Sequence, residues 1–195
     1  MNASFYRLPS ESAIDAWLTA TPRSFRFVLK GSRLITHARR LESGQALQTF
    51  LGRAGRFGSR LAAILWQLPP GQERDDERLL RFVEQLPETV LQAVEFRHSS
   101  WCAPEVDGLL ARCGVARVAV STPAQGIETL PGSGPVYVRF HGLSGGYAHD
   151  YTESELRPWV KALRTSGGRT GFAFFNNDGE ARAPSDAVQL RSLLG

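Results

Sequence analysis

Six short apolar runs, rich in β-branched and aromatic residues, alternate along the chain with stretches of helical spacing. Because each run is almost continuously apolar, it is typical of a strand that is covered on both faces of a parallel sheet. A remnant of a further strand is expected at Asn2–Tyr6, which brings the predicted number to about seven. The six runs are Phe25–Lys30, Leu61–Leu68, Leu91–Arg97, Ala116–Ser121, Val136–His141 and Gly171–Asn176.

The segments between these runs predict amphipathic helices. Thr152-Glu153-Ser154-Glu155 has the pattern of a capping box in front of one of them. Alternating strands and helices indicate βα units, and right-handed crossovers then give either an open doubly wound sheet or a closed barrel. Apolar residues at i, i+3, i+4 and i+7 occur in three sets: Leu47, Phe50, Leu51 and Ala54; Val106, Leu109, Leu110 and Cys113; and Leu156, Trp159, Val160 and Leu163.

Length and composition are those of one globular domain. The chain has 195 residues, of which 42% are hydrophobic and 22% are charged. No apolar run approaches the roughly 20 residues that cross a bilayer, and the N-terminus has no pattern of a secretory signal, so we expect a cytoplasmic protein. The two cysteines, Cys102 and Cys113, are too few for a disulfide scaffold or a zinc knuckle.

Positive charge is concentrated in one part of the chain. Between Arg23 and Arg60 there are nine basic residues and one acid, Glu42, so this stretch carries +8 (9 − 1) of a net +4 and the remainder carries −4 (4 − 8). Such a stretch attracts polyanions, among them nucleic acids. The alternative is a solvated helix face on which arginine stems cover apolar surface.

Polar residues fall late in several predicted strands and share one face with their strand neighbours. Tyr137, Arg139 and His141 alternate with apolar residues that point the other way, and Gln67 ends its run. Barrels place their chemistry at the carboxyl ends of strands, so we expect a polar, mostly basic pocket there. A structural network that fills the barrel is the alternative. The same asymmetry places Lys30, Glu95, Arg97 and Asn176 late in their strands.

The sequence resembles the YecE-like family, also called domain of unknown function 72, across essentially its whole length. The resemblance implies a TIM-barrel fold and supplies no established activity. It is carried by the segments Asn2–Pro9, Phe27–Lys30, Ile35–His37, Leu65–Pro70, Val94–Trp101, Tyr137–Gly142 and Phe175–Asp178.

Members of that family usually begin with a further strand and helix. The resemblance therefore implies a TIM-type (β/α) barrel lacking the first strand and helix, with residues 1–195 as a single incomplete barrel domain. An upstream start, a decayed gene and a neighbouring chain that fills the gap are the three explanations. A gap in the barrel would leave strand edges unpaired, which is an aggregation hazard.

Two residues are the candidate catalytic pair. Glu95 could act as a base or as a counter-ion, and His141 is suited to acid–base catalysis because its intrinsic pKa lies near neutrality. Arginine can bind phosphate or carboxylate through two parallel hydrogen bonds, so the pocket should prefer an anion. The candidate substrate-binding residues are Asn2, Tyr6, Lys30, Gln67, Arg97, His98, Trp101, Arg139, Asn176, Asn177 and Asp178; Tyr6 and Trp101 would stack on a ring or pack under loops.

We assign no metal and no cofactor. Glu95, His98, His141 and Asp178 are the only plausible metal ligands, and the arginines between them would repel a cation. The expected function is that of a hydrolase-like enzyme acting on a phosphorylated or nucleic-acid substrate. A non-catalytic nucleic-acid-binding protein and an inactive truncated fragment are the alternatives. An anionic small molecule or a nucleic acid is the expected partner, and no membrane is expected.

Overall fold

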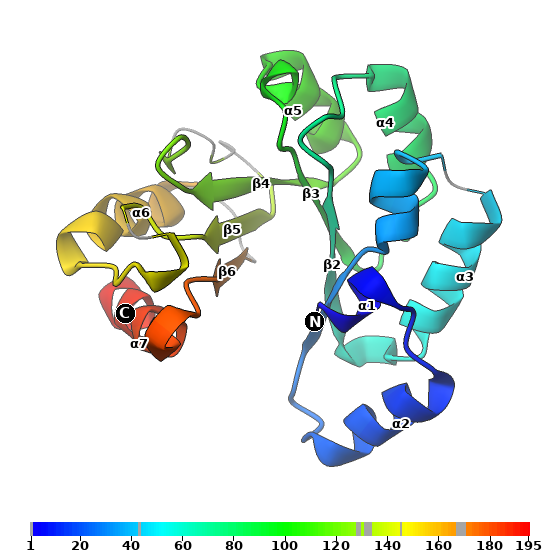
Figure 1. The fold of residues 1–195 in the computed structure, drawn as a ribbon, viewed down its shortest axis with the longest axis horizontal. Helices are drawn as coiled ribbons and strands as arrows, with labels where there is room; N and C mark the ends of the chain where they lie inside the picture. The colour runs from blue at the N-terminus through cyan, green and yellow to red at the C-terminus, as the bar shows by residue number, and fades with distance from the viewer. Residues whose placement is uncertain (1, 43, 128–129, 131–133, 145, 167–170) are drawn as a thin grey trace. The chain divides into compact units, whose positions relative to one another are not determined.

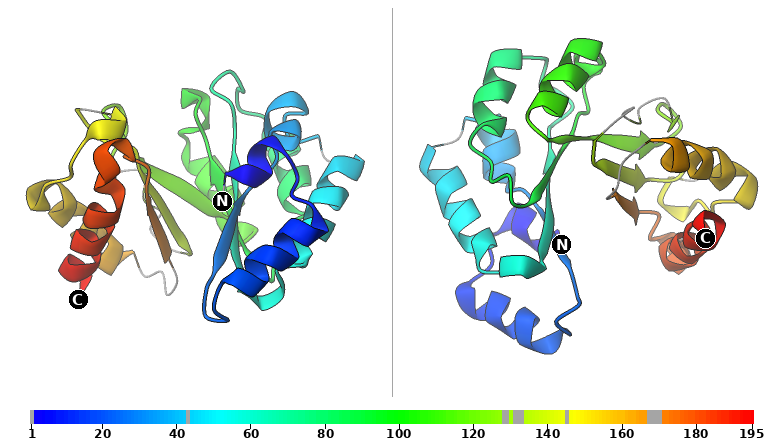
Figure 2. Two further views of the ribbon diagram at one scale, coloured as in Figure 1. Left: turned by 60° about the horizontal axis from the view of Figure 1, so that its bottom comes forward. Right: turned by 180° about the vertical axis from the view of Figure 1, so that it is seen from behind.

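The computed structural model describes residues 2–42, 44–127, 130, 134–144, 146–166 and 171–195. The chain divides into two compact units, Met1–Val115 and Ala116–Gly195, which are shown in Figures 1 and 2 and are described separately below. The prediction of a single domain over 1–195 stays a prediction.

The first unit contains three parallel strands in chain order. Strand β1 (Phe27–Lys30) pairs with β2 (Leu61–Gln67), which pairs with β3 (Leu91–Glu95). The connections contain the helices α2 (Glu11–Ala20), α3 (Gly44–Gly55), α4 (Asp76–Val83) and α5 (Pro104–Arg112) and the short turns η1 (Leu34–Ala38), η2 (Gly58–Arg60) and η3 (Ser99–Trp101).

One face of this sheet packs against the helices and forms the core of the unit. Leu29, Trp66 and Val94 belong to the same buried apolar cluster as Phe50 of α3 and Leu110 of α5. Figures 1 and 2 show α3, α4 and α5 on one side of the strands. The buried Trp66 indole also donates a 2.9 Å hydrogen bond from its Nε1 to Gln92 Oε1, which satisfies a polar group inside this layer.

The second unit repeats the arrangement with β4 (Ala116–Ser121), β5 (Val136–Phe140) and β6 (Gly171–Phe175), again parallel. Its helices are α6 (Glu153–Thr165) and α7 (Arg182–Leu194), with short turns η5 (Gly146–Ala148) and η6 (Gly179–Ala181). Phe140 packs into an apolar cluster with Leu156 and Trp159 of α6. Its ring also stacks on that of Phe175, with 4.4 Å between the two ring centroids. The predicted capping box is confirmed, because the Thr152 hydroxyl and the Glu155 carboxylate each accept from the other's backbone N–H.

The prediction of a strand at Asn2–Tyr6 is wrong. Ala3–Tyr6 forms the one-turn helix α1, whose buried residues are the adjacent pair Ser4 and Phe5 rather than alternate ones. The Ser4 hydroxyl donates to the carbonyl of Lys30 at 2.7 Å, so α1 contacts the carboxyl end of β1 without pairing as a strand. The described residues therefore contain six strands, and each begins and ends within two residues of its predicted run. The chain has an α/β fold with six parallel strands.

Candidate functional site

In the first unit, polar residues share the sheet face that points away from the helical core. Leu29, Trp66 and Val94 belong to the core, so Lys30, Gln67 and Glu95, each one residue later, lie on the opposite face. Gln67 and Glu95 are directly opposed in the register of β2 and β3. We call Lys30, Gln67 and Glu95 the first polar face. The predicted alternation is confirmed here.

Glu95 is the most buried member of this face. Its residue exposure is 0%, and its carboxylate forms an ion pair with Arg97, whose side chain is 30% exposed. Leaving a buried carboxylate without a counter-ion is strongly unfavourable, and Arg97 is the counter-ion of the Glu95 carboxylate. The predicted catalytic pair, Glu95 with His141, stays a prediction.

Positive charge gathers around the end of β1. Lys30 Nζ lies 4.2 Å from the centroid of the Phe5 ring, a cation–π contact with α1. His37 follows in η1, and its pKa is lowered by burial and then by the nearby charges of Arg33 and Lys30. Lys30, Arg33 and His37 thus place basic groups near one another at this end of the first unit.

In the second unit, Arg139 belongs to a corresponding polar face. Val138 and Phe140 pack into the apolar cluster, so Arg139 points to the other side of β5. Its Nε donates a 3.0 Å hydrogen bond to Asn176 Oδ1, directly after β6, so the structure brings these two predicted residues together. His141 is half-buried just beyond β5, where its backbone N–H donates to Ser121 O at 3.0 Å. We call Arg139, His141 and Asn176 the second polar face.

Asn177 and Asp178 lie beyond β6 in very different surroundings. Asn177 is fully buried, and its amide donates to the carbonyl of His149 at 2.7 Å and to Asp186 Oδ2 at 2.5 Å. Burial raises the pKa of Asp186, against the lowering effect of that hydrogen bond. Asn177 thus ties a loop to α7, whereas Asp178 is exposed.

The remaining predicted residues of the first unit serve turns and packing. His98 Nδ1 accepts from the N–H of Ser100 at 3.2 Å and so caps η3. Trp101 is fully buried, stacks on Phe96 at 4.5 Å and donates its indole N–H to Gln72 O at 2.8 Å. The Trp101 ring therefore offers no surface to a ligand. Asn2 and Tyr6 are exposed at α1.

Sequence reasoning missed a serine–histidine–glutamate relay in the loop after β5. Ser144 Oγ lies 3.3 Å from His149 Nδ1, and His149 Nε2 lies 3.2 Å from Glu155 Oε2. Burial raises the pKa of Glu155, but hydrogen bonds from the Thr152 backbone and hydroxyl, with His149, bring that pKa below its ordinary value. The available signal was Gly142-Leu143-Ser144-Gly145-Gly146, a Gly-x-Ser-x-Gly pattern directly after a strand; Gly145 lies outside the described residues.

Much of the basic stretch is engaged within the first unit. Arg56 of α3 pairs with Asp15 at 2.9 Å and with Glu11 at 3.1 Å. The pKa of Arg56 is raised, mainly by its hydrogen bond to Asp15. Arg60 donates to the carbonyl of Leu18 at 2.8 Å. These arginines fasten α2 to the following elements, so they contribute less to a polyanion surface than their number indicates.

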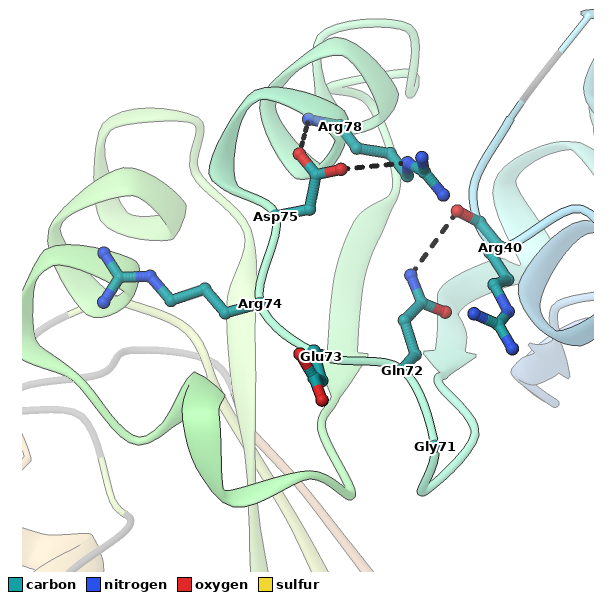
Figure 3. Close-up of a pocket in the computed structure, with 7 residues that line it drawn as sticks. All are labelled: Arg40, Gly71, Gln72, Glu73, Arg74, Asp75 and Arg78. Atoms are coloured by element: carbon teal, nitrogen blue, oxygen red, sulfur yellow. Dashed lines mark hydrogen bonds and ion pairs between the residues drawn. The ribbon is translucent and has the colours of Figure 1, made fainter.

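A cavity of about 330 Å³ opens in the first unit between α4 and the residues that follow η1. Figure 3 shows its lining, in which charged side chains surround the amide of Gln72. It contains none of the predicted site residues. The lining residues are Arg40, Gly71, Gln72, Glu73, Arg74, Asp75 and Arg78.

Neither a metal-binding cluster nor a membrane-spanning helix occurs in the described ranges. They contain no group of three or more His, Cys, Asp or Glu residues placed to hold a metal ion. None of the helices in the same ranges combines the length and the apolar character that a membrane span requires. Cys102 is exposed, Cys113 is half-buried, and both are free thiols.

Comparisons with known proteins agree with this architecture. The chain is 24% identical to the UPF0759 protein YunF of Bacillus subtilis (strain 168), over 100% of its own length and 82% of that protein. A crystal structure of a DUF72 family protein from Thermotoga maritima matches 97% of the chain and 81% of that protein, with a TM-score of 0.77 and 26% identity. A DUF72 family protein from Enterococcus faecalis V583 has the same fold, with a TM-score of 0.82 at 22% identity over 100% of this chain and 88% of that one.

The family model described as "Protein of unknown function DUF72" matches residues 1–195, which is the whole chain. This match confirms the resemblance that the strand-end segments indicate. The chain belongs to the DUF72 family.

Proposed function

We propose that this protein is a hydrolase-type enzyme whose substrate carries a phosphate or carboxylate group. The observation that carries the proposal is the position of Glu95, a fully buried carboxylate on the sheet face away from the helical core, ion-paired with Arg97 and opposed to Gln67. The corresponding face of β5 presents Arg139, hydrogen-bonded to Asn176. Ionisable groups repeated at strand ends are typical of binding sites, because burying them for packing alone is unfavourable.

The chemistry follows from the residue types. At the first polar face, water attacks the phosphorus of a phosphate ester and loses its proton to Glu95, the bond to the ester oxygen breaks, and the departing oxygen takes a proton from solvent water. His141 is the acid–base group proposed for the second polar face. Guanidinium groups stabilise the charge that develops on the phosphoryl oxygens. Lys30 and Arg97 are the cations proposed for substrate binding at the first polar face, and Arg139 is the one proposed at the second. The finer fold prediction, a TIM-type barrel, also stays a proposal.

The test compares turnover with stability. Purified protein is assayed with p-nitrophenyl phosphate and bis(p-nitrophenyl) phosphate, and Glu95→Gln is expected to lower kcat by at least about 100-fold, with the melting temperature nearly unchanged. His141→Ala tests the second polar face by the same two measurements. Glu88→Gln changes an exposed carboxylate in the loop before β3 and serves as the matched control. Loss of folding in both site variants, or unaltered turnover, would refute the proposal.

A second candidate function is acyl hydrolysis by Ser144, which the relay of Ser144, His149 and Glu155 favours. The exposed Ser144 hydroxyl would attack an ester carbonyl and pass its proton to His149 Nδ1; the ester bond breaks, and the leaving alcohol takes that proton. Water then hydrolyses the acyl-serine. The ring is turned relative to the usual triad, in which Nε2 faces the serine.

A fluorophosphonate probe separates this candidate from the first. Covalent labelling at Ser144, detected by intact-protein mass spectrometry, is expected in the parent protein and should vanish in Ser144→Ala and His149→Ala. Ser154→Ala, an exposed serine of the same region, should label normally. An unlabelled parent protein rejects the serine mechanism and leaves the strand-face proposal untouched.

A further inference from the structure

The cavity beside α4 shares no residue with either polar face and contains a buried acceptor, the side-chain oxygen of Gln72. Gln72 is 4% exposed, and its Oε1 has no hydrogen-bond partner within the described part of the chain. Its Nε2 donates to the carbonyl of Arg40 at 3.4 Å, which fixes the orientation of the amide. In Figure 3 the oxygen lies on the side of the Arg40 guanidinium. Buried acceptors are rarely left unsatisfied, so this oxygen indicates a missing donor.

Most charged groups of the lining are already paired. Arg74 contacts both carboxylate oxygens of Asp76, at 2.7 and 2.6 Å, and Arg78 pairs with Asp75 at 3.2 Å. Asp75 also accepts from the N–H of Arg78, so the first turn of α4 is capped by the chain itself. These contacts leave the helix N-terminus without a role in binding.

Two opposite charges remain. Arg40 and Glu73 are both exposed, and neither forms an ion pair with any residue that the structure describes. Arg40 stands in the left-handed backbone region with φ 47°, and so does its neighbour Leu41 with φ 72°. That conformation is unfavourable for non-glycine residues and recurs at ligand sites. Here it places the carbonyl of Arg40 against the Gln72 amide and the guanidinium at the cavity.

We propose that this cavity binds a free α-amino acid. The ligand carboxylate pairs with the Arg40 guanidinium, and the ligand ammonium donates to Gln72 Oε1 and pairs with Glu73. A guanidinium matches a carboxylate through two parallel hydrogen bonds, and an ammonium offers three donors. The volume of about 330 Å³ lies at the lower end of small-molecule sites and accommodates an amino acid with its side chain.

Binding to the unmodified protein is tested first. L-alanine, L-glutamine and L-phenylalanine are titrated by calorimetry and by saturation-transfer NMR. The best binder is then compared with its N-acetyl form, which lacks the ammonium, and with its carboxamide, which lacks the carboxylate. Each blocked form should bind at least about ten-fold more weakly. The proposal would be overturned if no amino acid binds at millimolar concentration, or if a blocked form binds as tightly as the free amino acid. It would also be overturned if inorganic phosphate competes for the cavity as effectively as the amino acid does.

Variants then assign the contacts. Glu73→Gln keeps side-chain length and removes the negative charge, and Arg40→Gln replaces the guanidinium by a shorter neutral amide. Each variant should weaken binding at least about ten-fold. Arg39→Gln and Glu88→Gln remove the same charges outside the lining and should remain within about two-fold of the parent. Affinity that falls equally in the variants and the controls would contradict the assignment. Because the blocked ligands test the same contacts on the parent protein, a variant that fails to fold leaves the proposal testable.

Discussion

At the scale of single residues, the first polar face is the feature that needs a functional explanation. Glu95 is fully buried where a sheet residue could as well be apolar, and Arg97 supplies its counter-ion. Replacing buried ion pairs by apolar residues is often neutral or stabilising, so folding alone does not require this pair. The proposed role in binding or catalysis would explain why polar groups occupy this face.

The charge around β1 predicts the titration of His37. Its pKa is lowered by burial and by the charges of Arg33 and Lys30, so the folded state favours the neutral ring. The stabilising contribution of that neutral ring is complete above the ordinary pKa of 6.5 and is lost as the pH falls from there through the lowered value. Arg33→Gln should raise the His37 pKa, measured by proton NMR of the ring. Arg23→Gln is the control, and an equal shift there would contradict the local origin of the effect.

Gly142 allows the close approach of the loop that contains Ser144. Its φ is +89°, and an added Cβ would lie 1.8 Å from the carbonyl oxygen of Gly146. We expect Gly142→Ala to destabilise the protein by about 2–5 kcal/mol, from backbone strain and overpacking together.

Gly146 provides the control for that prediction. It also has positive φ, but an added Cβ would meet nothing within 4 Å. Gly146→Ala should therefore cost only the backbone term of about 1–2 kcal/mol. Urea denaturation measures both values, and equal losses would show that the contact with Gly146 does not restrict position 142.

At the scale of elements, the capping box of α6 is expected to stabilise the helix. Thr152 accepts from the N–H of Glu155 and donates from its hydroxyl and its N–H to the Glu155 carboxylate. Thr152→Ala should lower the free energy of unfolding by about 1 kcal/mol, measured by chemical denaturation. Ser154→Ala, in the same turn, should change it by less than half as much. A smaller loss for Thr152→Ala than for Ser154→Ala would contradict the capping role.

The six strands could be predicted because nearly continuous apolar runs dominate their local preference. α1 could not, since four residues are too few to show a helical period, and the buried pair Ser4 and Phe5 depends on Lys30 and His37, far along the chain. The alternation of Lys30, Gln67 and Arg139 followed from strand geometry alone.

The candidate site was harder to predict in its details. Trp101 and Asn177 were expected at a ligand, but their polar atoms bind the carbonyls of Gln72 and His149. The relay from Ser144 to Glu155 depends on a turn whose path is set by backbone contacts. The cavity beside α4 arises from two loops that are distant in sequence, and no local pattern marks such a pair.

At the scale of the whole molecule, the distribution of charge bears on nucleic-acid binding. Arg56 and Arg60 are engaged by α2 and its flanking residues, while Arg33, Arg39 and Arg40 around η1 remain exposed. We expect binding of single-stranded or duplex DNA to be weak and to fall steeply with salt. Removing the three exposed arginines should flatten that salt dependence more than removing Arg53, Arg56 and Arg60. The reverse order, measured by fluorescence anisotropy, would contradict this expectation.

The central proposal is that each polar face binds a ligand. Titration of isotope-labelled protein with inorganic phosphate, followed by amide NMR, tests it most directly. Saturable shifts are expected in each unit at its own strand ends, Lys30, Gln67 and Glu95 in the first and Arg139 and Asn176 in the second, with the second set weakened in Arg139→Gln. Shifts confined to exposed arginines of the helices, with these strand ends unchanged, would contradict it.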